Sequence, residues 1–137
     1  YQVDLIGYKY YMIDIMAAIC LEQMKKLPEH LKFRRHVQER YKNELHPIIE
    51  RPYHSETVQY YCAKVPPKHR DSLIDYLADK KIHKPLHKYS PLVQDREYPV
   101  ADVEWLKLIS LPVHNRMEES DIDYVIYWVN KYFDKVL

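Results

Sequence analysis

Glycine is almost absent from this sequence, because Gly7 is the only one among 137 residues. A chain of this length with average composition has roughly ten glycines. Phosphate-binding loops and nucleophile elbows need several glycines, since the backbone there approaches a phosphate closely or turns sharply. The sequence therefore excludes a Walker A loop, a G-x-G-x-x-G dinucleotide-binding turn and a G-x-S-x-G elbow.

An excess of one charge sign is also missing, because 21 Lys and Arg stand against 20 Asp and Glu. Nucleic-acid-binding proteins normally carry a basic excess or stripe. The one short basic run, Lys32, Arg34 and Arg35, fits an exposed helix face. We therefore expect no nucleic-acid partner.

Cysteines and long apolar runs are scarce too. Cys20 and Cys62 belong to no C-x-x-C pair and lie in apolar sequence, which predicts buried free thiols in a reducing compartment. No apolar run approaches the roughly 18 residues that span a bilayer, and residues 1–9 do not form a signal peptide. We expect a cytoplasmic protein without a membrane partner, and the first residue, Tyr1, points to a fragment of a longer chain.

Hydrophobic residues make up 47% of the sequence, enough for one packed domain. Residues 12–27 have almost no polar face and predict a helix that is buried on all sides. Either the rest of the domain folds around this helix, or a missing region or a partner subunit covers it. Pro28 should end it and begin a second helix, in which Phe33, Val37, Tyr41 and Leu45 recur every four residues.

The later elements follow from similar patterns. Ile122, Val125, Ile126, Val129, Phe133 and Val136 predict one apolar face of a C-terminal helix that begins near residue 118. Before it we expect a strand over 57–65, a helix over 70–80, a long loop over 81–99, a short helix over 101–107 and a brief apolar segment over 109–111. Several of the fourteen tyrosines occupy positions that a core would use, namely Tyr41, Tyr60, Tyr76 and Tyr124.

Few residues point to chemistry directly. His83 and His87 have the H-x-x-x-H spacing of zinc ligands, but Pro85 interrupts the helix that this spacing needs. We therefore expect no metal site, and we find no Ser-His-Asp signature. A lysine, three tyrosines and Gly7 stand directly before the apolar helix, where free N–H groups and the helix dipole favour an anion. A phosphate or carboxylate site and a simple tight turn both fit this segment.

The same segment and most of the remaining sequence resemble a known protein family. Residues 7–27, GYKYYMIDIMAAICLEQMKKL, resemble the GYxYxM-x-D-I-x-A-A-I-x-L-x-Q-L-x-K-L stretch of the DegT/DnrJ/EryC1/StrS aminotransferases. The similarity continues in family order through RRHVQERYKNEL, TVQYYCAKVPPKHRDSLIDYLADKKI, KPLHKYSPL and YPVADVEWLKLISLPVHNRMEESDIDYVIYWV. It covers nearly the whole chain.

The resemblance implies an α/β fold, the C-terminal small domain of a fold-type I pyridoxal phosphate enzyme. Its helices would pack on a short mixed sheet, preceded by a buried interdomain helix. Residues 1–27 would form the edge of the large domain and this helix, and residues 28–137 the small domain. The implied enzyme is a homodimer that passes an amino group, with glutamate as the expected donor, to a keto-sugar of a nucleotide sugar.

The resemblance also implies where the sites lie. The cofactor-forming lysine belongs to a segment ahead of this region, and none of the fourteen lysines has that context, so we expect no catalytic residue in this chain. Lys9, Tyr10 and Tyr11 would contact the phosphate of the partner subunit's pyridoxal phosphate, although the family commonly has Asn at the position of Lys9 or Tyr11. His83, Lys84 and His87 would contact the substrate, in a loop shorter than the family's.

Two other classes stay open at this point. The chain could be a shortened, non-catalytic relative that associates with an intact subunit. It could also be a binding module that shares only the architecture.

Overall fold

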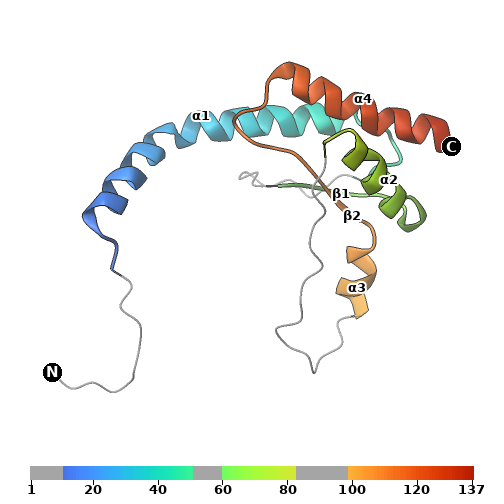
Figure 1. Cartoon of the computed structure of the whole chain (residues 1–137), viewed down its shortest axis with the longest axis horizontal. Helices are drawn as coiled ribbons and strands as arrows, with labels where there is room; N and C mark the ends of the chain where they lie inside the picture. The colour runs from blue at the N-terminus through green and yellow to red at the C-terminus, as the bar shows by residue number, and fades with distance from the viewer. Residues whose placement is uncertain (1–10, 51–59, 83–98) are drawn as a thin grey trace.

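The computed structural model of the chain describes residues 11–50, 60–82 and 99–137. In Figure 1, α1 forms a long arch, α4 runs beside its C-terminal part, α2 packs against α4, and the two paired strands lie beneath these helices. The elements are, in chain order, α1 (Asp14–Glu44), β1 (Tyr61–Lys64), α2 (Pro67–Asp79), α3 (Pro99–Trp105), β2 (Leu108–Leu111) and α4 (Glu119–Val136).

The helix α1 continues through Pro28, so the predicted break between two helices is wrong. Proline removes one N–H and crowds the carbonyl four residues earlier, at Met24. Both Pro28 and Met24 are exposed, so water can satisfy that carbonyl, and the flanking Leu, Glu, Lys and Met residues favour helix. A proline inside a helix bends it, in agreement with the curve of α1 in Figure 1.

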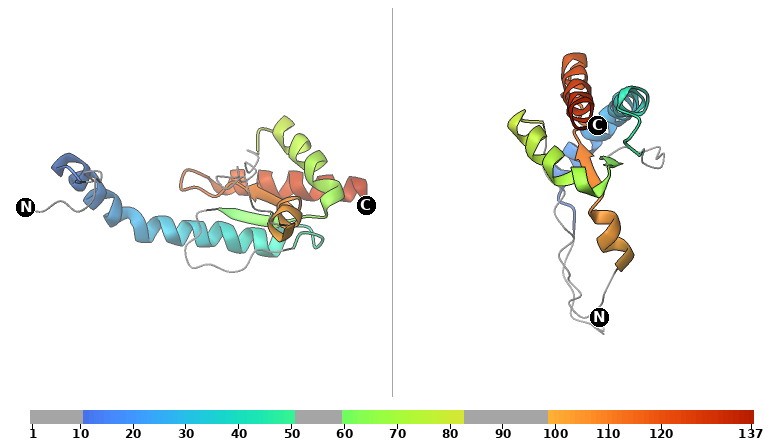
Figure 2. Two further views of the ribbon diagram at one scale, coloured as in Figure 1. Left: turned by 90° about the horizontal axis from the view of Figure 1, so that it is seen from below. Right: turned by 90° about the vertical axis from the view of Figure 1, so that its right-hand side faces the viewer.

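The N-terminal half of α1 is not covered by the other described elements, which agrees with the alternative in which a missing region or a partner subunit covers it. Ile15, for example, is 70% exposed, and Cys20, expected to be buried, is exposed as well. Figure 2 shows this half extending away from the other elements. The alternative in which the rest of the domain folds around it is thereby excluded. We call its exposed side chains the α1 apolar surface: Ile13, Ile15, Met16, Ile19, Leu21, Met24 and Leu27.

The two strands pair antiparallel, with Tyr61 opposite Leu111 and Lys64 opposite Leu108. An isolated antiparallel bridge joins Lys64 to Glu50. Within the described residues the sheet is therefore antiparallel and not mixed as expected. Alternate residues, such as Ala63 and Ile109, turn to the core, and Cys62 on the other face of β1 is half-buried.

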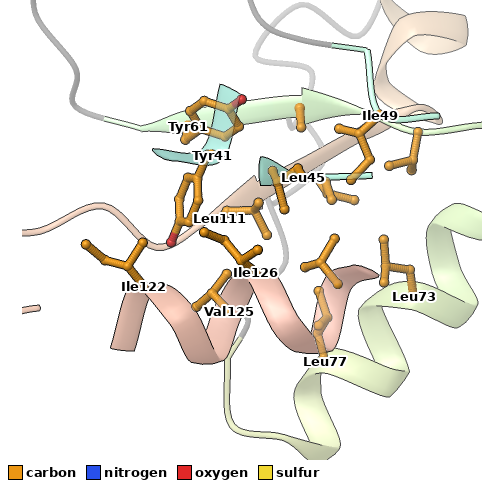
Figure 3. Packing of buried hydrophobic residues seen from close by; sticks show 14 of the residues in the cluster. Tyr41, Leu45, Ile49, Tyr61, Leu73, Leu77, Leu111, Ile122, Val125 and Ile126 are labelled. Atoms are coloured by element: carbon orange, nitrogen blue, oxygen red, sulfur yellow. The ribbon is translucent and has the colours of Figure 1, made fainter. Parts of the chain in front are cut away.

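The core lies between α4, the C-terminal half of α1, the strands and α2 (Figure 3). The predicted apolar face of α4 is confirmed from Ile122 to Phe133. Val136, expected on this face, is exposed because the last turn runs past the core. Among the tyrosines expected in the core, Tyr41 is fully buried, whereas Tyr60 and Tyr124 are exposed.

Candidate functional site

The predicted site residues fall mostly outside the described residues. This holds for Lys9 and Tyr10 in the cofactor group and for His83, Lys84 and His87 in the substrate group. Tyr11 is described, directly before α1, with 77% of its side chain exposed. Of the predicted cofactor-binding segment, the structure therefore describes only the part next to the N-terminus of α1.

Backbone donors are available at this end of α1. Ile13 is the N-cap residue, with extended backbone (φ −77°, ψ 154°) and no side-chain capping bond. The first helical bond runs from the N–H of Ala17 to the carbonyl of Ile13, 3.0 Å apart. The amides of residues 14–16 precede that bond and have no acceptor within the helix.

A negative side chain also lies at this end of α1. Asp14 lies in the first turn of α1, where a carboxylate interacts favourably with the helix dipole but repels a second anion. The Tyr11 hydroxyl and the backbone amides are suitable donors to a phosphate, and a cation is needed to offset Asp14. The donor set thus fits the phosphate of pyridoxal phosphate, provided that Lys9 supplies the positive charge.

Polar contacts with α4 fix the direction of α1 and hence the place of its N-terminus. The guanidinium of Arg40 contacts Glu44, Glu119 at 2.8 Å and Asp123 at 2.6 Å. The hydrogen bond from Arg40 holds the pKa of the Glu44 carboxyl below its ordinary value. His36 lies 2.7 Å from Glu119. Sequence reasoning missed the contacts of Arg40 and His36 with α4, because Glu119 is about eighty residues away and no local pattern joins them.

The described parts of the chain contain neither a cluster of metal-ligating side chains nor a helix that could cross a membrane. Across residues 11–50, 60–82 and 99–137, no group of three or more His, Cys, Asp and Glu side chains is placed to hold a metal ion. His83 and His87 lie outside these ranges, so the expectation for them stays a prediction. None of the described helices, α1 included, has the length and hydrophobicity needed to cross a membrane.

Comparison with known proteins gives several similar chains. GDP-perosamine synthase of Escherichia coli O157:H7 is 26% identical over 146 aligned residues, which cover 97% of this chain and 40% of that protein. Spr1654 of Streptococcus pneumoniae, described as a sugar aminotransferase and solved in its PMP-form, is 26% identical with a TM-score of 0.85, over 99% of this chain and 39% of that one.

The aminotransferase TlmJ of Streptoalloteichus hindustanus shares the fold, with a TM-score of 0.86 at 24% identity over 99% of this chain and 40% of that one. The chain thus spans about 40% of the length of the relatives that it matches. The model of the DegT/DnrJ/EryC1/StrS aminotransferase family matches this chain from residue 1 to residue 130. On this match, the chain belongs to the DegT/DnrJ/EryC1/StrS aminotransferase family.

Proposed function

We propose that this chain is the C-terminal part of a pyridoxal phosphate-dependent aminotransferase that acts on nucleotide-linked keto-sugars, with glutamate as amino donor. Family membership over residues 1–130 and the 40% share of its relatives' length support this assignment. When bound, pyridoxal phosphate supplies the electron sink and carries the amino group between donor and acceptor. Family membership does not favour a non-catalytic shortened relative.

One observation carries the proposal: the α1 apolar surface, which follows the candidate phosphate site directly in the chain, is exposed. A patch of this kind on a soluble protein marks a surface that another part covers. We assign that role to a cofactor-binding domain that precedes this region in the complete protein. Because α1 runs unbroken across residues 27 and 28, it would join that domain rigidly to the small domain.

The residues around the N-terminus of α1 would bind and orient the cofactor. Lys9 would place its ammonium beside the phosphate, and the Tyr11 hydroxyl and the free amides of residues 14–16 would donate hydrogen bonds. Tyr10 would complete the contact. In a homodimer these groups reach the cofactor of the partner subunit, so each site needs both subunits.

The substrate would contact a different segment. His83, Lys84 and His87 carry two imidazoles and one ammonium over five residues, a set that can bind the diphosphate and hydroxyl groups of a nucleotide sugar. The loop is shorter than in the resembling family, which would leave more room at the sugar. We expect it to select the substrate and to perform no proton transfer.

An activity assay of the complete protein tests the proposal. The protein is incubated with pyridoxal phosphate, glutamate and each of a series of nucleotide-linked keto-hexoses, and 2-oxoglutarate and the amino sugar are measured. We expect both products in equal amounts, and none from residues 1–137 alone. Turnover by residues 1–137 alone, or absence of turnover with every keto-sugar offered to the complete protein, would contradict the assignment.

A further inference from the structure

Aromatic and cationic side chains gather on the surface where α2 and α4 meet, and the proposed function does not use them. Trp128 lies at the centre, with the ring centroids of Tyr76, Tyr124 and Tyr127 at 6.0, 6.0 and 5.1 Å from its own. Tyr124 is 46% and Tyr127 53% exposed, so the group belongs to the surface. We call it the Trp128 cluster: Tyr76, Lys80, Tyr124, Tyr127, Trp128 and Lys131.

Two lysines lie over the central ring. The Nζ of Lys80, just past the end of α2, is 4.6 Å from the Trp128 centroid, and the Nζ of Lys131 is 4.8 Å from it. The Lys131 ammonium also donates a 2.8 Å hydrogen bond to the Tyr127 hydroxyl. Attraction to the aromatic ring holds both ammonium groups close to it. They are therefore no more than about 10 Å apart, within one Debye length at 0.1 M salt.

These two cations have no carboxylate within ion-pair distance in the described part of the chain. Other lysines do, such as Lys64, which lies 2.7 Å from Glu104. Asp79 and Asp134, exposed on the same two helices, form no ion pair with Lys80 or Lys131 among the described residues. The cluster thus presents two ammonium groups and exposed rings, and no described carboxylate forms an ion pair with either ammonium group.

We propose that the Trp128 cluster is a docking surface for an acidic segment of a partner protein. Tyrosine and tryptophan are enriched among residues that anchor protein interfaces, since they bury much area at a small entropic cost. The partner's carboxylates would supply the counter-charge that Lys80 and Lys131 lack. Two ammonium groups already lie over the indole, which disfavours a stacked base or sugar. This role is separate from the proposed transamination.

Binding of a labelled octaglutamate peptide to the complete protein tests the proposal by fluorescence anisotropy at low salt. We expect saturable binding that salt weakens. The double variant Lys80→Gln/Lys131→Gln should bind about tenfold more weakly, because two exposed ion pairs with the peptide are lost. The matched control Lys32→Gln/Lys68→Gln removes two exposed charges outside the cluster and should stay within twofold of the parent.

A third variant separates ring contacts from charge. Tyr124→Ala removes an exposed ring and no cation, and it should weaken binding about fivefold if the rings anchor the peptide. Circular dichroism checks that each variant is folded. Equal weakening in the control pair, or no saturable binding by the parent, overturns the proposal. So does an oligothymidylate of equal charge that binds as tightly as the peptide, because the surface would then favour nucleic acid.

Discussion

The hydroxyl of Tyr41 in α1 donates a 2.9 Å hydrogen bond to the carbonyl of Pro112, just after β2. This bond joins the long helix to the sheet inside the core, where Tyr41 is fully buried and its ring meets that of Tyr61 edge-on at 5.1 Å. Burial also raises the pKa of Tyr41, so the phenol stays a neutral donor. The direction of α1, and hence the position of the candidate site, depends on such contacts.

Replacing Tyr41 by Phe should destabilise the protein by about 1 to 3 kcal/mol, because the Pro112 carbonyl loses its buried donor. Urea unfolding measures the change. Tyr60→Phe is the control, since Tyr60 is exposed and its variant should differ by less than about 0.5 kcal/mol. Equal stability of Tyr41→Phe and the parent would show that the bond contributes nothing.

Asn130 connects α4 to the end of α1 through both atoms of its amide. Its Nδ2 donates to the Glu44 carbonyl at 2.8 Å, and its Oδ1 accepts from the His46 N–H at 2.7 Å. Asn130→Ala should cost about 1 to 3 kcal/mol, because the Glu44 carbonyl and the His46 N–H both lose their partner. The exposed Asn43→Ala is the control. Faster hydrogen exchange of the His46 amide in Asn130→Ala would locate the effect, and unchanged exchange would contradict it.

The Glu104 carboxylate should make stability depend on pH. Hydrogen bonds from Lys107 and then Lys64 lower its pKa to about 2 from an ordinary 4.5. Its contribution is therefore complete above pH 4.5 and disappears as the pH falls towards 2. Glu104→Gln should be less stable than the parent at pH 7 and equal to it near pH 2. A difference between their urea midpoints that stays constant over this range would contradict the prediction.

Lys9 is the residue to change at the proposed phosphate site. Lys9→Ala in the complete protein should weaken pyridoxal phosphate binding by about ten- to a hundredfold, because one charge-assisted contact is lost. The control Lys32→Ala removes an equal charge from an exposed position on α1. Cofactor titration gives both affinities. If Lys9→Ala binds as tightly as the parent, Lys9 is only a turn residue.

The sequence predicts best the elements whose signals are local. The face of α4 from Ile122 to Phe133 and the strand that contains Tyr61–Lys64 follow directly from the spacing of apolar residues. The helix predicted over 70–80 begins earlier, at Pro67, because proline is favoured in the first turn. The order of the motifs indicates the family, which the family match confirms over residues 1–130.

The predictions from the sequence fail where contacts or exposure set by distant parts of the chain determine the local structure. Pro28 was expected to end a helix, but exposure on both sides lets the helix continue. The apolar pattern of residues 12–27 indicates that they must be covered but cannot show by what, and in this chain they are exposed. The contacts of Arg40 and Asn130 with distant segments cannot be predicted from the spacing of neighbouring residues in the sequence.

Mapping the lysine that binds the cofactor tests the central claim most directly. The complete protein is loaded with pyridoxal phosphate, reduced with borohydride, digested and analysed by mass spectrometry. We expect one modified lysine, in a preceding domain and outside residues 1–137. Stoichiometric modification of Lys9 or of any other lysine of this chain would contradict the claim that it supplies phosphate and substrate contacts but no catalytic residue.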